Sequence, residues 1–350
     1  MENTAGRQRE ISYESFRLPH NPAMTPPLDR RQLLLAGTLA ATVPMGTPAG
    51  PLADSDGREI ELWPTGVPGA ENVSARESVE DLVRDGAARD RVVWHVTRPL
   101  ITVFEPRATP RGITFLVVPG GGYRRVVIDR EGFDTAGWLT AQGFGAAVLR
   151  YRLPGDRWAA GPDAPVHDGQ RALRWLRTNA GAMGTKLGII GFSAGGHLSG
   201  RLITEPELAY PKHDALDEAS GRPDMAVLMY PVILTTGAAA HAGSAQQLIL
   251  SGVAPTDVAL ARFEPTAHVS AATPPTMLVH AADDQTVPLE NSLRMYDALR
   301  AAGVSSELHV FESGGHGFGL RSIAGKSVAS WPMLVQNWAQ AQGLLVPGGT

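Results

Sequence analysis

Short apolar runs that alternate with helical stretches constrain the fold of this chain more than any other sequence feature. The run 113–118, Ile-Thr-Phe-Leu-Val-Val, is typical of a strand buried on both faces of a sheet. Further strands are predicted at 91–96, 100–104, 145–149, 187–191, 225–230, 277–280 and 307–311, and helices near 132–142, 167–179, 195–204 and 289–302. Gly143 and Gly303 are predicted to end two of these helices. The alternation predicts an α/β fold with a mainly parallel sheet and helices on both faces.

The domain organisation follows from where this alternation begins. Residues 1–53 are predicted to be a leader, and residues 54–350 a single folded domain that starts with an irregular segment over about 60–72. We find no repeat, low-complexity tract or linker after the leader. The stretch 231–275 is longer than a simple connection between strands requires, so it could fold over a site at the edge of the sheet.

The leader carries a pair of arginines, Arg30 and Arg31, followed at once by the short apolar run 33–43 and then by small residues and prolines. This pattern is similar to a twin-arginine export signal, which predicts a protein that folds in the cytoplasm and works outside it. The apolar run is too short to span a bilayer, so no stable membrane anchor is expected. The alternative is a disordered tail that contains the arginine pair by chance.

Charge and cysteine content exclude several classes of function. The formal net charge is -4 and the sequence pI is about 6.2, with no basic stripe of the kind that nucleic acid binding requires. The chain has no cysteine, which excludes disulfides, thiolate metal sites and a cysteine nucleophile. No pair of histidines stands at ligand spacing with a carboxylate, so neither a metal nor another cofactor is expected.

One turn in the middle of the chain has the pattern of a catalytic element. The predicted strand 187–191 runs into Gly191-Phe192-Ser193-Ala194-Gly195 and then into a predicted helix. This is the context of a nucleophile elbow, in which a strained turn exposes a serine hydroxyl. A Cβ at Gly191 or Gly195 is expected to collide with the neighbouring strand or helix. Ser193 is therefore the predicted nucleophile, and the amide of Ala194 is expected to face developing negative charge.

A serine nucleophile needs a histidine to take its proton. Of the ten histidines, His280 and His309 lie within predicted strands, and His197 lies on the helix after the elbow, where packing or hydrogen bonding explains it better. His316 is flanked by glycines in the loop after the last predicted strand. His316 is therefore the predicted general base, and activity should rise with pH through the imidazole range, near about 6.5.

The histidine in turn needs a carboxylate that orients it. Asp283 and Asp284 both follow the predicted strand that ends at 280, and so both fall at the edge of the sheet where Ser193 and His316 are expected. Asp284 is preferred because the next residues, Gln-Thr-Val-Pro, begin a helix and leave its side chain free to point into the site. Asp283 is expected to cap that turn.

The glycine run at 120–122 follows the buried strand 113–118 and is the predicted oxyanion hole. Glycines let bare backbone amides converge on an oxyanion without obstruction. A phosphate-binding loop is the alternative, but the glycine spacing of a dinucleotide site is missing, and no Gly-Lys-Ser or Gly-Lys-Thr follows.

Several segments together resemble the bacterial α/β-hydrolase esterases related to acetylxylan and other carbohydrate acetyl esterases and to feruloyl-esterase-like (BD-FAE-like) enzymes. The matching segments are Leu62-Trp63-Pro64, Pro68-Gly69, 119–123, Glu131-Gly132, 149–154, Asp168, 170–172, 191–198, 273–275, 284–288 and 314–319. The resemblance implies the α/β-hydrolase fold, a Ser193, Asp284 and His316 triad, and an oxyanion hole made by the amides of Gly121, Gly122 and Ala194. Pro119 departs from the related lipase-like pattern, which has a histidine before the glycine run, so this loop is expected to be held differently.

The sequence therefore predicts a serine esterase that hydrolyses small, acetyl-like acyl esters on a sugar or polysaccharide fragment through an acyl-enzyme, with a small-molecule or oligosaccharide ester as its substrate. An exopeptidase-like amidase is the alternative enzyme, because the same triad cleaves amides. A binding protein without catalytic activity on a hydrolase scaffold is a further alternative, although such proteins usually lack one member of the triad.

Overall fold

The computed structural model describes residues 52, 56–83 and 88–345, which all lie in the compact unit that runs from Pro48 to Thr350. The predicted export signal at Arg30 and Arg31 lies outside the described residues and stays a prediction. No helix in the described part of the chain is long and apolar enough to cross a membrane.

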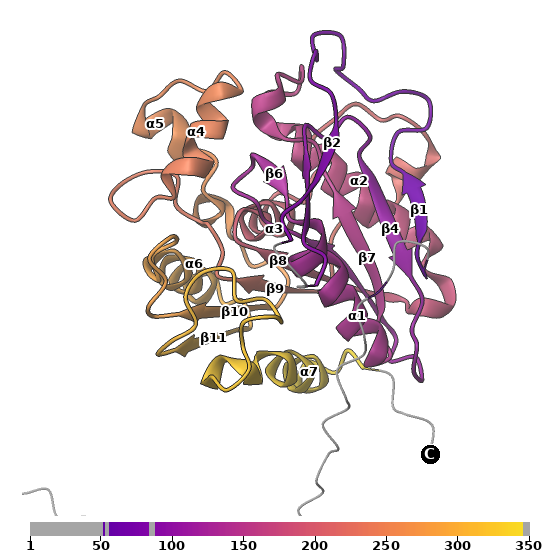
Figure 1. The fold of residues 1–350 in the computed structure, drawn as a ribbon, viewed down its shortest axis with the longest axis vertical. Helices are drawn as coiled ribbons and strands as arrows, with labels where there is room; N and C mark the ends of the chain where they lie inside the picture. The colour runs from indigo at the N-terminus through magenta and orange to yellow at the C-terminus, as the bar shows by residue number, and fades with distance from the viewer. Residues whose placement is uncertain (1–51, 53–55, 84–87, 346–350) are drawn as a thin grey trace, which may run out of the picture. The chain divides into compact units, whose positions relative to one another are not determined.

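An eight-stranded sheet forms the centre of the described unit (Figure 1), with the strand order β1-β4-β7-β5-β8-β9-β10-β11. Its strands are β1 (Arg58–Glu61), β4 (Leu100–Phe104), β5 (Ile113–Val118), β7 (Gly145–Arg150), β8 (Lys186–Phe192), β9 (Met225–Met229), β10 (Thr276–Ala281) and β11 (Ser306–Phe311). The pairs from β7 to β11 are all parallel, whereas β1 and β4 join antiparallel at one end. The predicted α/β fold with a mainly parallel sheet is confirmed.

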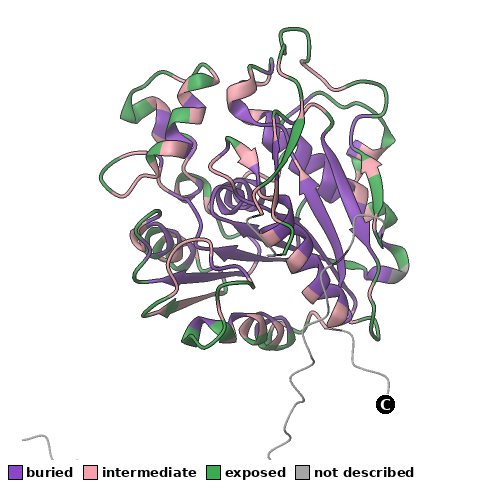
Figure 2. Cartoon of the chain, viewed as in Figure 1, coloured by how far each residue is buried: buried purple, intermediate pink, exposed green. Residues whose placement is uncertain are grey.

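The apolar runs form strands because both faces of the sheet are covered. All residues of β4, β5, β9 and β10 are buried, and the inner strands form the continuous buried centre seen in Figure 2. A strand with two buried faces is mostly apolar, which accounts for the absence of polar alternation in these runs.

Seven α-helices are present in the described residues, and the main ones cover the sheet. Their bounds are α1 (Asp134–Ala141), α2 (Ala164–Asn179), α3 (Ala194–Thr204), α4 (Ala242–Leu250), α5 (Asp257–Ala261), α6 (Glu290–Ala301) and α7 (Trp331–Ala341). The helices α1 and α7 meet at Trp138 and Trp331, whose ring centroids lie 5.1 Å apart. Gly143 and Gly303 follow α1 and α6 with positive φ angles of 85° and 71°, which confirms that they end these helices.

The structure also contains elements that the sequence analysis did not predict. The segment 58–61 overlaps the start of the irregular segment predicted over about 60–72, and it pairs with β4 as the edge strand β1. The predicted strand 91–96 forms β3 (Arg91–Trp94), which lies in a separate three-stranded sheet with β2 (Ser78–Asp81) and β6 (Arg125–Val126). The stretch 231–275 contains α4 and α5, which Figure 1 shows away from the centre of the large sheet.

Candidate active site

Ser193 stands between β8 and α3 in the strained conformation expected of an elbow. Its φ and ψ angles are 52° and -118°, outside the regions that a residue with a side chain adopts easily. Hydrogen bonds fix the turn from both sides: the Ser193 amide donates to the Met229 carbonyl at 3.0 Å, and the Ser193 carbonyl accepts from the Val232 amide at 3.0 Å. The end of β9 therefore holds the nucleophile in place.

The two elbow glycines are required by close contacts, as the sequence predicted. A Cβ at Gly191 would lie 2.1 Å from Oγ of Ser199 on α3, and a Cβ at Gly195 would lie 2.2 Å from the Val118 carbonyl oxygen at the end of β5. Both distances are far below van der Waals contact. Only glycine allows the strand, the turn and the helix to approach this closely.

The structure brings Ser193, His316 and Asp284 together in one chain of hydrogen bonds. Oγ of Ser193 lies 2.9 Å from Nε2 of His316, and Nδ1 of His316 lies 2.7 Å from Oδ2 of Asp284. The three residues follow β8, β11 and β10 respectively, so all three stand at the carboxyl edge of the sheet. The arrangement can transfer a proton from the serine to the imidazole while the carboxylate holds the ring.

Asp284 is buried, and its surroundings keep it ionised. Burial opposes its negative charge, but hydrogen bonds from His280, His316 and the Val287 amide outweigh this and hold the pKa of Asp284 well below its usual value. Its Oδ1 accepts from the amides of Thr286 and Val287 at 2.9 Å each. The carboxylate therefore stays charged beside His316, which is the state that an orienting group requires.

Asp283 has a different role from the one predicted. The turn after β10 is capped by Asp284 itself, and Asp283 instead reaches the loop that carries His316. Oδ1 of Asp283 accepts from the amides of Gly314 and Gly315 at 2.9 Å and 2.8 Å. These two residues follow β11, so no local sequence signal indicates the contact, and Asp283 fixes the loop of the histidine.

The glycine loop after β5 is held by Glu131. The Gly120 amide donates to Oε2 of Glu131 at 2.7 Å, and the Pro119 carbonyl accepts from the Tyr151 hydroxyl at 2.8 Å. Within the described residues, no acceptor is found for the amides of Gly121, Gly122 and Ala194. Gly121 and Gly122 line the same cavity as Ser193, so these amides can stabilise negative charge there.

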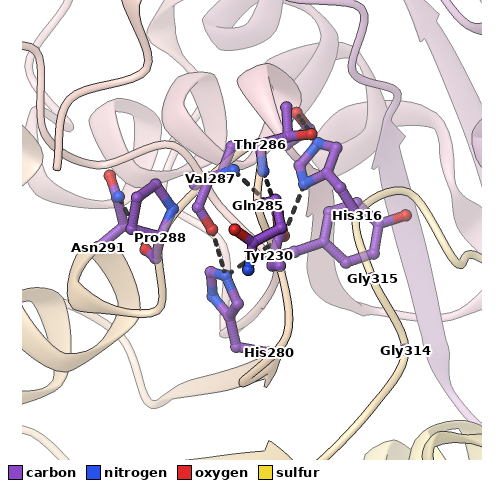
Figure 3. A network of polar contacts seen from close by, with 12 residues as sticks. Tyr230, His280, Gln285, Thr286, Val287, Pro288, Asn291, Gly314, Gly315 and His316 are labelled. Carbon is purple, nitrogen blue, oxygen red and sulfur yellow. Dashed lines mark hydrogen bonds and ion pairs between the residues drawn. The ribbon is translucent and has the colours of Figure 1, made fainter.

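Glu131 also connects this loop to the other side of the site, a role that the sequence analysis did not identify. Its Oε1 accepts from the Tyr230 hydroxyl at 3.0 Å, and the Tyr230 ring lies 5.0 Å from the His316 ring, edge to face (Figure 3). Burial raises the pKa of Glu131, although its hydrogen bonds from Gly120 and Tyr230 oppose the shift. The carboxyl group therefore joins the glycine loop to the surroundings of the histidine.

Replacing Glu131 with Gln should change how stability depends on pH. The raised pKa of Glu131 means that the folded chain binds this proton more tightly than the unfolded chain. Its contribution to the free energy of unfolding is complete below the ordinary glutamate value of about 4.3 and is lost as the pH rises through the raised pKa. Chemical denaturation between about pH 4 and pH 8 should therefore show a smaller loss of stability with rising pH in the variant. Glu312→Gln, at an exposed position, is the control, and equal slopes in parent and Glu131→Gln would contradict this assignment.

The other histidines singled out in the sequence have structural partners. Nδ1 of His197, on α3, lies 2.8 Å from the Tyr123 hydroxyl, which confirms the predicted hydrogen-bonding role. Burial lowers the pKa of His197 to about 3, so its ring is neutral. His280 lies in β10 and bonds to Ser292, and His309 lies in β11 and bonds to Glu307.

A cavity of about 350 Å³ opens beside Ser193 and His316. Its other lining residues are Leu82, Val92, Gly121, Gly122, Arg124, Arg125, Val127, Arg130, Glu131, His241, Gly243, Thr286 and Gly317. His241 and Gly243 come from 231–275, so this stretch contributes to the wall of the cavity. In the part of the chain that the structure describes, no group of three or more His, Asp or Glu residues could hold a metal ion.

His241 was not identified from the sequence, because it stands in a segment without a catalytic motif. It caps α4, where its Nδ1 accepts from the Ser244 amide at 3.1 Å. An amide can only donate, so the proton of the neutral imidazole lies on Nε2. Burial, and then the charge of His316, lower the pKa of His241. The ring therefore stays neutral and offers an N–H donor at the cavity.

Comparisons with known proteins find similarity to named xylan-degrading enzymes. Over 205 residues the chain is 37% identical to "Endo-1,4-beta-xylanase B" of Butyrivibrio fibrisolvens, which covers 58% of this chain and 32% of that protein. Over 216 residues it is 33% identical to "Acetylxylan esterase" of Xylanibacter ruminicola, which covers 60% of this chain and 42% of that protein. The chain thus spans less than half the length of either curated relative.

Solved structures give the same fold. An acetyl ester-xyloside bifunctional hydrolase from Caldicellulosiruptor lactoaceticus is 32% identical, with a TM-score of 0.67 over 83% of this chain and 98% of that one. The carboxylesterase Cest-2923 from Lactobacillus plantarum is 24% identical, with a TM-score of 0.58 over 78% of this chain and 100% of that one, and supports the α/β-hydrolase fold. The BD-FAE family model matches residues 105–299, more than half of the sequence. The chain belongs to the BD-FAE family of α/β-hydrolases.

Proposed function

We propose that the protein is a serine esterase that hydrolyses small, acetyl-like acyl esters on a sugar or polysaccharide fragment. The observation that carries this proposal is the hydrogen-bonded chain from Ser193 through His316 to Asp284, which faces a cavity beside a glycine loop. Membership in the BD-FAE family and similarity to proteins named as an acetylxylan esterase and an acetyl ester-xyloside hydrolase support the substrate class.

The geometry accounts for each step of such a reaction. Nε2 of His316 takes the proton of Ser193 as Oγ attacks the ester carbonyl, and the amides of Gly121, Gly122 and Ala194 stabilise the oxyanion. His316 then gives the proton to the leaving alcohol, and the C–O bond of the ester breaks to leave an acyl-serine. In the second half, His316 activates a water molecule that releases the acid and restores the serine.

The shape of the site supports an extended alcohol. A second cavity of about 300 Å³ adjoins the first and shares Leu82, Arg130 and Gly317 with it. A simple acetyl group needs only a small part of this space. The remaining volume suits a saccharide on the alcohol side of the ester.

The function is tested by product release from a panel of acetylated and feruloylated oligosaccharides, with matched peptide amides beside them. We expect acetate release from the saccharides at a rate well above that of amide cleavage. A fluorophosphonate probe should label the protein at Ser193. Faster cleavage of the amides would favour the alternative amidase function. The absence of both labelling and hydrolysis would contradict the proposal that the protein is an enzyme.

A further inference from the structure

Among the described residues, the cavity beside Ser193 carries positive charge that neighbouring carboxylates do not neutralise. Three arginines line it, and Glu131 is the only carboxylate among its described lining residues. Arg130 is paired, because its Nε donates to Asp90 at 2.9 Å. Both oxygens of Glu131 accept hydrogen bonds from Gly120 and Tyr230. Within the described part of the chain, the side chains of Arg124 and Arg125 therefore have no carboxylate partner, although the formal net charge of the sequence is -4.

These two arginines are consecutive and come from the glycine loop and the strand that follows it. Arg124 is exposed, and its guanidinium has no ion pair or hydrogen bond among the described residues. The guanidinium of Arg125 lies over the Trp94 ring, 5.2 Å from its centroid, and its Nε is buried without a partner. Stacking on an aromatic ring leaves the N–H groups of an arginine available in the plane of the guanidinium.

His241 and Gly243 reach the same cavity from the stretch 231–275, and His241 adds a hydrogen-bond donor rather than an acceptor. The Nδ1 of His241 is occupied by Ser244, so only its Nε2–H can reach a ligand. Arg124, Arg125 and His241 thus offer donors to the cavity, while Glu131 already accepts hydrogen bonds from the protein. A ligand that complements this lining carries hydrogen-bond acceptors and negative charge.

We propose that Arg124 and Arg125 form a carboxylate subsite, so that the preferred substrate is an acyl ester of a saccharide that contains a uronic acid. The inference rests on the proposed esterase function and specifies its alcohol. Carboxylates are bound by arginine through two parallel hydrogen bonds, a geometry that the planar guanidinium favours. Because Arg124 is exposed at the cavity, the carboxylate belongs on the larger alcohol part rather than on the small acyl group.

The test compares two substrates that differ in one group: an acetylated xylo-oligosaccharide that carries a uronic acid, and the same molecule after reduction of its carboxyl to a primary alcohol. The parent protein should prefer the uronate by about tenfold in kcat/KM. Arg124→Gln and Arg125→Gln should each reduce this ratio, and the double variant should bring it close to one. The ratio is taken within each variant, so a general loss of activity cancels. Added salt should lower the parent's preference.

Arg222→Gln serves as the matched control, because Arg222 is exposed and lies outside the cavities beside the site, and it should keep the parental ratio. Equal rates for the two substrates in the parent protein would contradict the proposed carboxylate subsite, but not the proposed esterase function. A preference for p-nitrophenyl hemisuccinate over p-nitrophenyl acetate, without a preference for the uronate, would place the carboxylate on the acyl part and also overturn it.

A binding measurement tests the carboxylate subsite independently of the proposed esterase activity. Calorimetry with the deacetylated uronate oligosaccharide measures the subsite without any reaction. Binding should weaken by about tenfold or more when both arginines are replaced, and should be weak for the carboxyl-reduced saccharide. If the protein binds the uronate in this way but cleaves no ester, the proposed function fails while the subsite stands.

Discussion

Ser193→Ala is expected to lower kcat/KM for acetyl esters by about 10⁴-fold or more, which is the size of loss seen when a serine nucleophile is removed. The structure gives the reason, because Oγ of Ser193 is the atom that lies within hydrogen-bond distance of Nε2 of His316. Without this hydroxyl no acyl-enzyme can form. The glycine loop can then only polarise an ester for direct attack by water. Initial rates with p-nitrophenyl acetate and an acetylated oligosaccharide measure the effect.

Ser199→Ala is the matched control for this variant. Ser199 is also buried, stands on the helix that follows the elbow, and has a hydroxyl without a partner in the described part of the chain. It should keep most of the activity and the fluorophosphonate labelling that Ser193→Ala loses. Parental rates in a folded Ser193→Ala protein, checked by circular dichroism, would refute the mechanism.

The centre of the sheet could be predicted from the sequence because its strands are buried on both faces. The six residues of β5 are five apolar residues and one threonine, all buried and without polar alternation, as expected of a strand in a parallel sheet covered on both faces. The edge strand β1 is different, since most of its residues are exposed and its four residues include two glutamates and an arginine. It forms a strand because it pairs with β4, which lies about forty residues further along the chain. A local sequence pattern cannot predict such a distant pairing.

The candidate site shows the same division between local and distant signals. The sequence indicates Ser193 and His316 as site residues because glycines stand close to them, and it indicates Asp284 because it follows a predicted strand. Glu131-Gly132 is one of the segments that carry the family resemblance, but nothing there indicates what Glu131 contacts, and His241 lies outside those segments. Glu131 stands in a π-helical turn before α1, and only the folded chain brings it to Gly120 and Tyr230. The role of Asp283 was wrongly predicted for the same reason, because its partners lie beyond β11.

Asp284→Asn is expected to lower kcat by about 10³-fold to 10⁴-fold. A comparison with Asp283→Asn shows which of the two neighbouring aspartates orients His316. An asparagine at 284 can present an N–H to Nδ1 of His316, where the carboxylate Oδ2 now lies 2.7 Å away. Nδ1 then accepts, the imidazole proton moves to Nε2, and the ring can no longer take the proton of Ser193. The hydrogen bonds that Oδ1 accepts from Thr286 and Val287 can be kept by the asparagine carbonyl, so the fold of the turn should survive.

Asp283→Asn tests whether the loss of activity is specific to position 284. Oδ1 of Asp283 accepts two amide hydrogen bonds from Gly314 and Gly315, and the carbonyl of asparagine can accept both. The loop of His316 should therefore stay in place, and kcat should remain within about tenfold of the parent. Steady-state kinetics at saturating p-nitrophenyl acetate measure both variants. If Asp283→Asn lost more activity than Asp284→Asn, the orienting carboxylate would have to be Asp283, and the 2.7 Å contact between Asp284 and His316 would not represent the active arrangement.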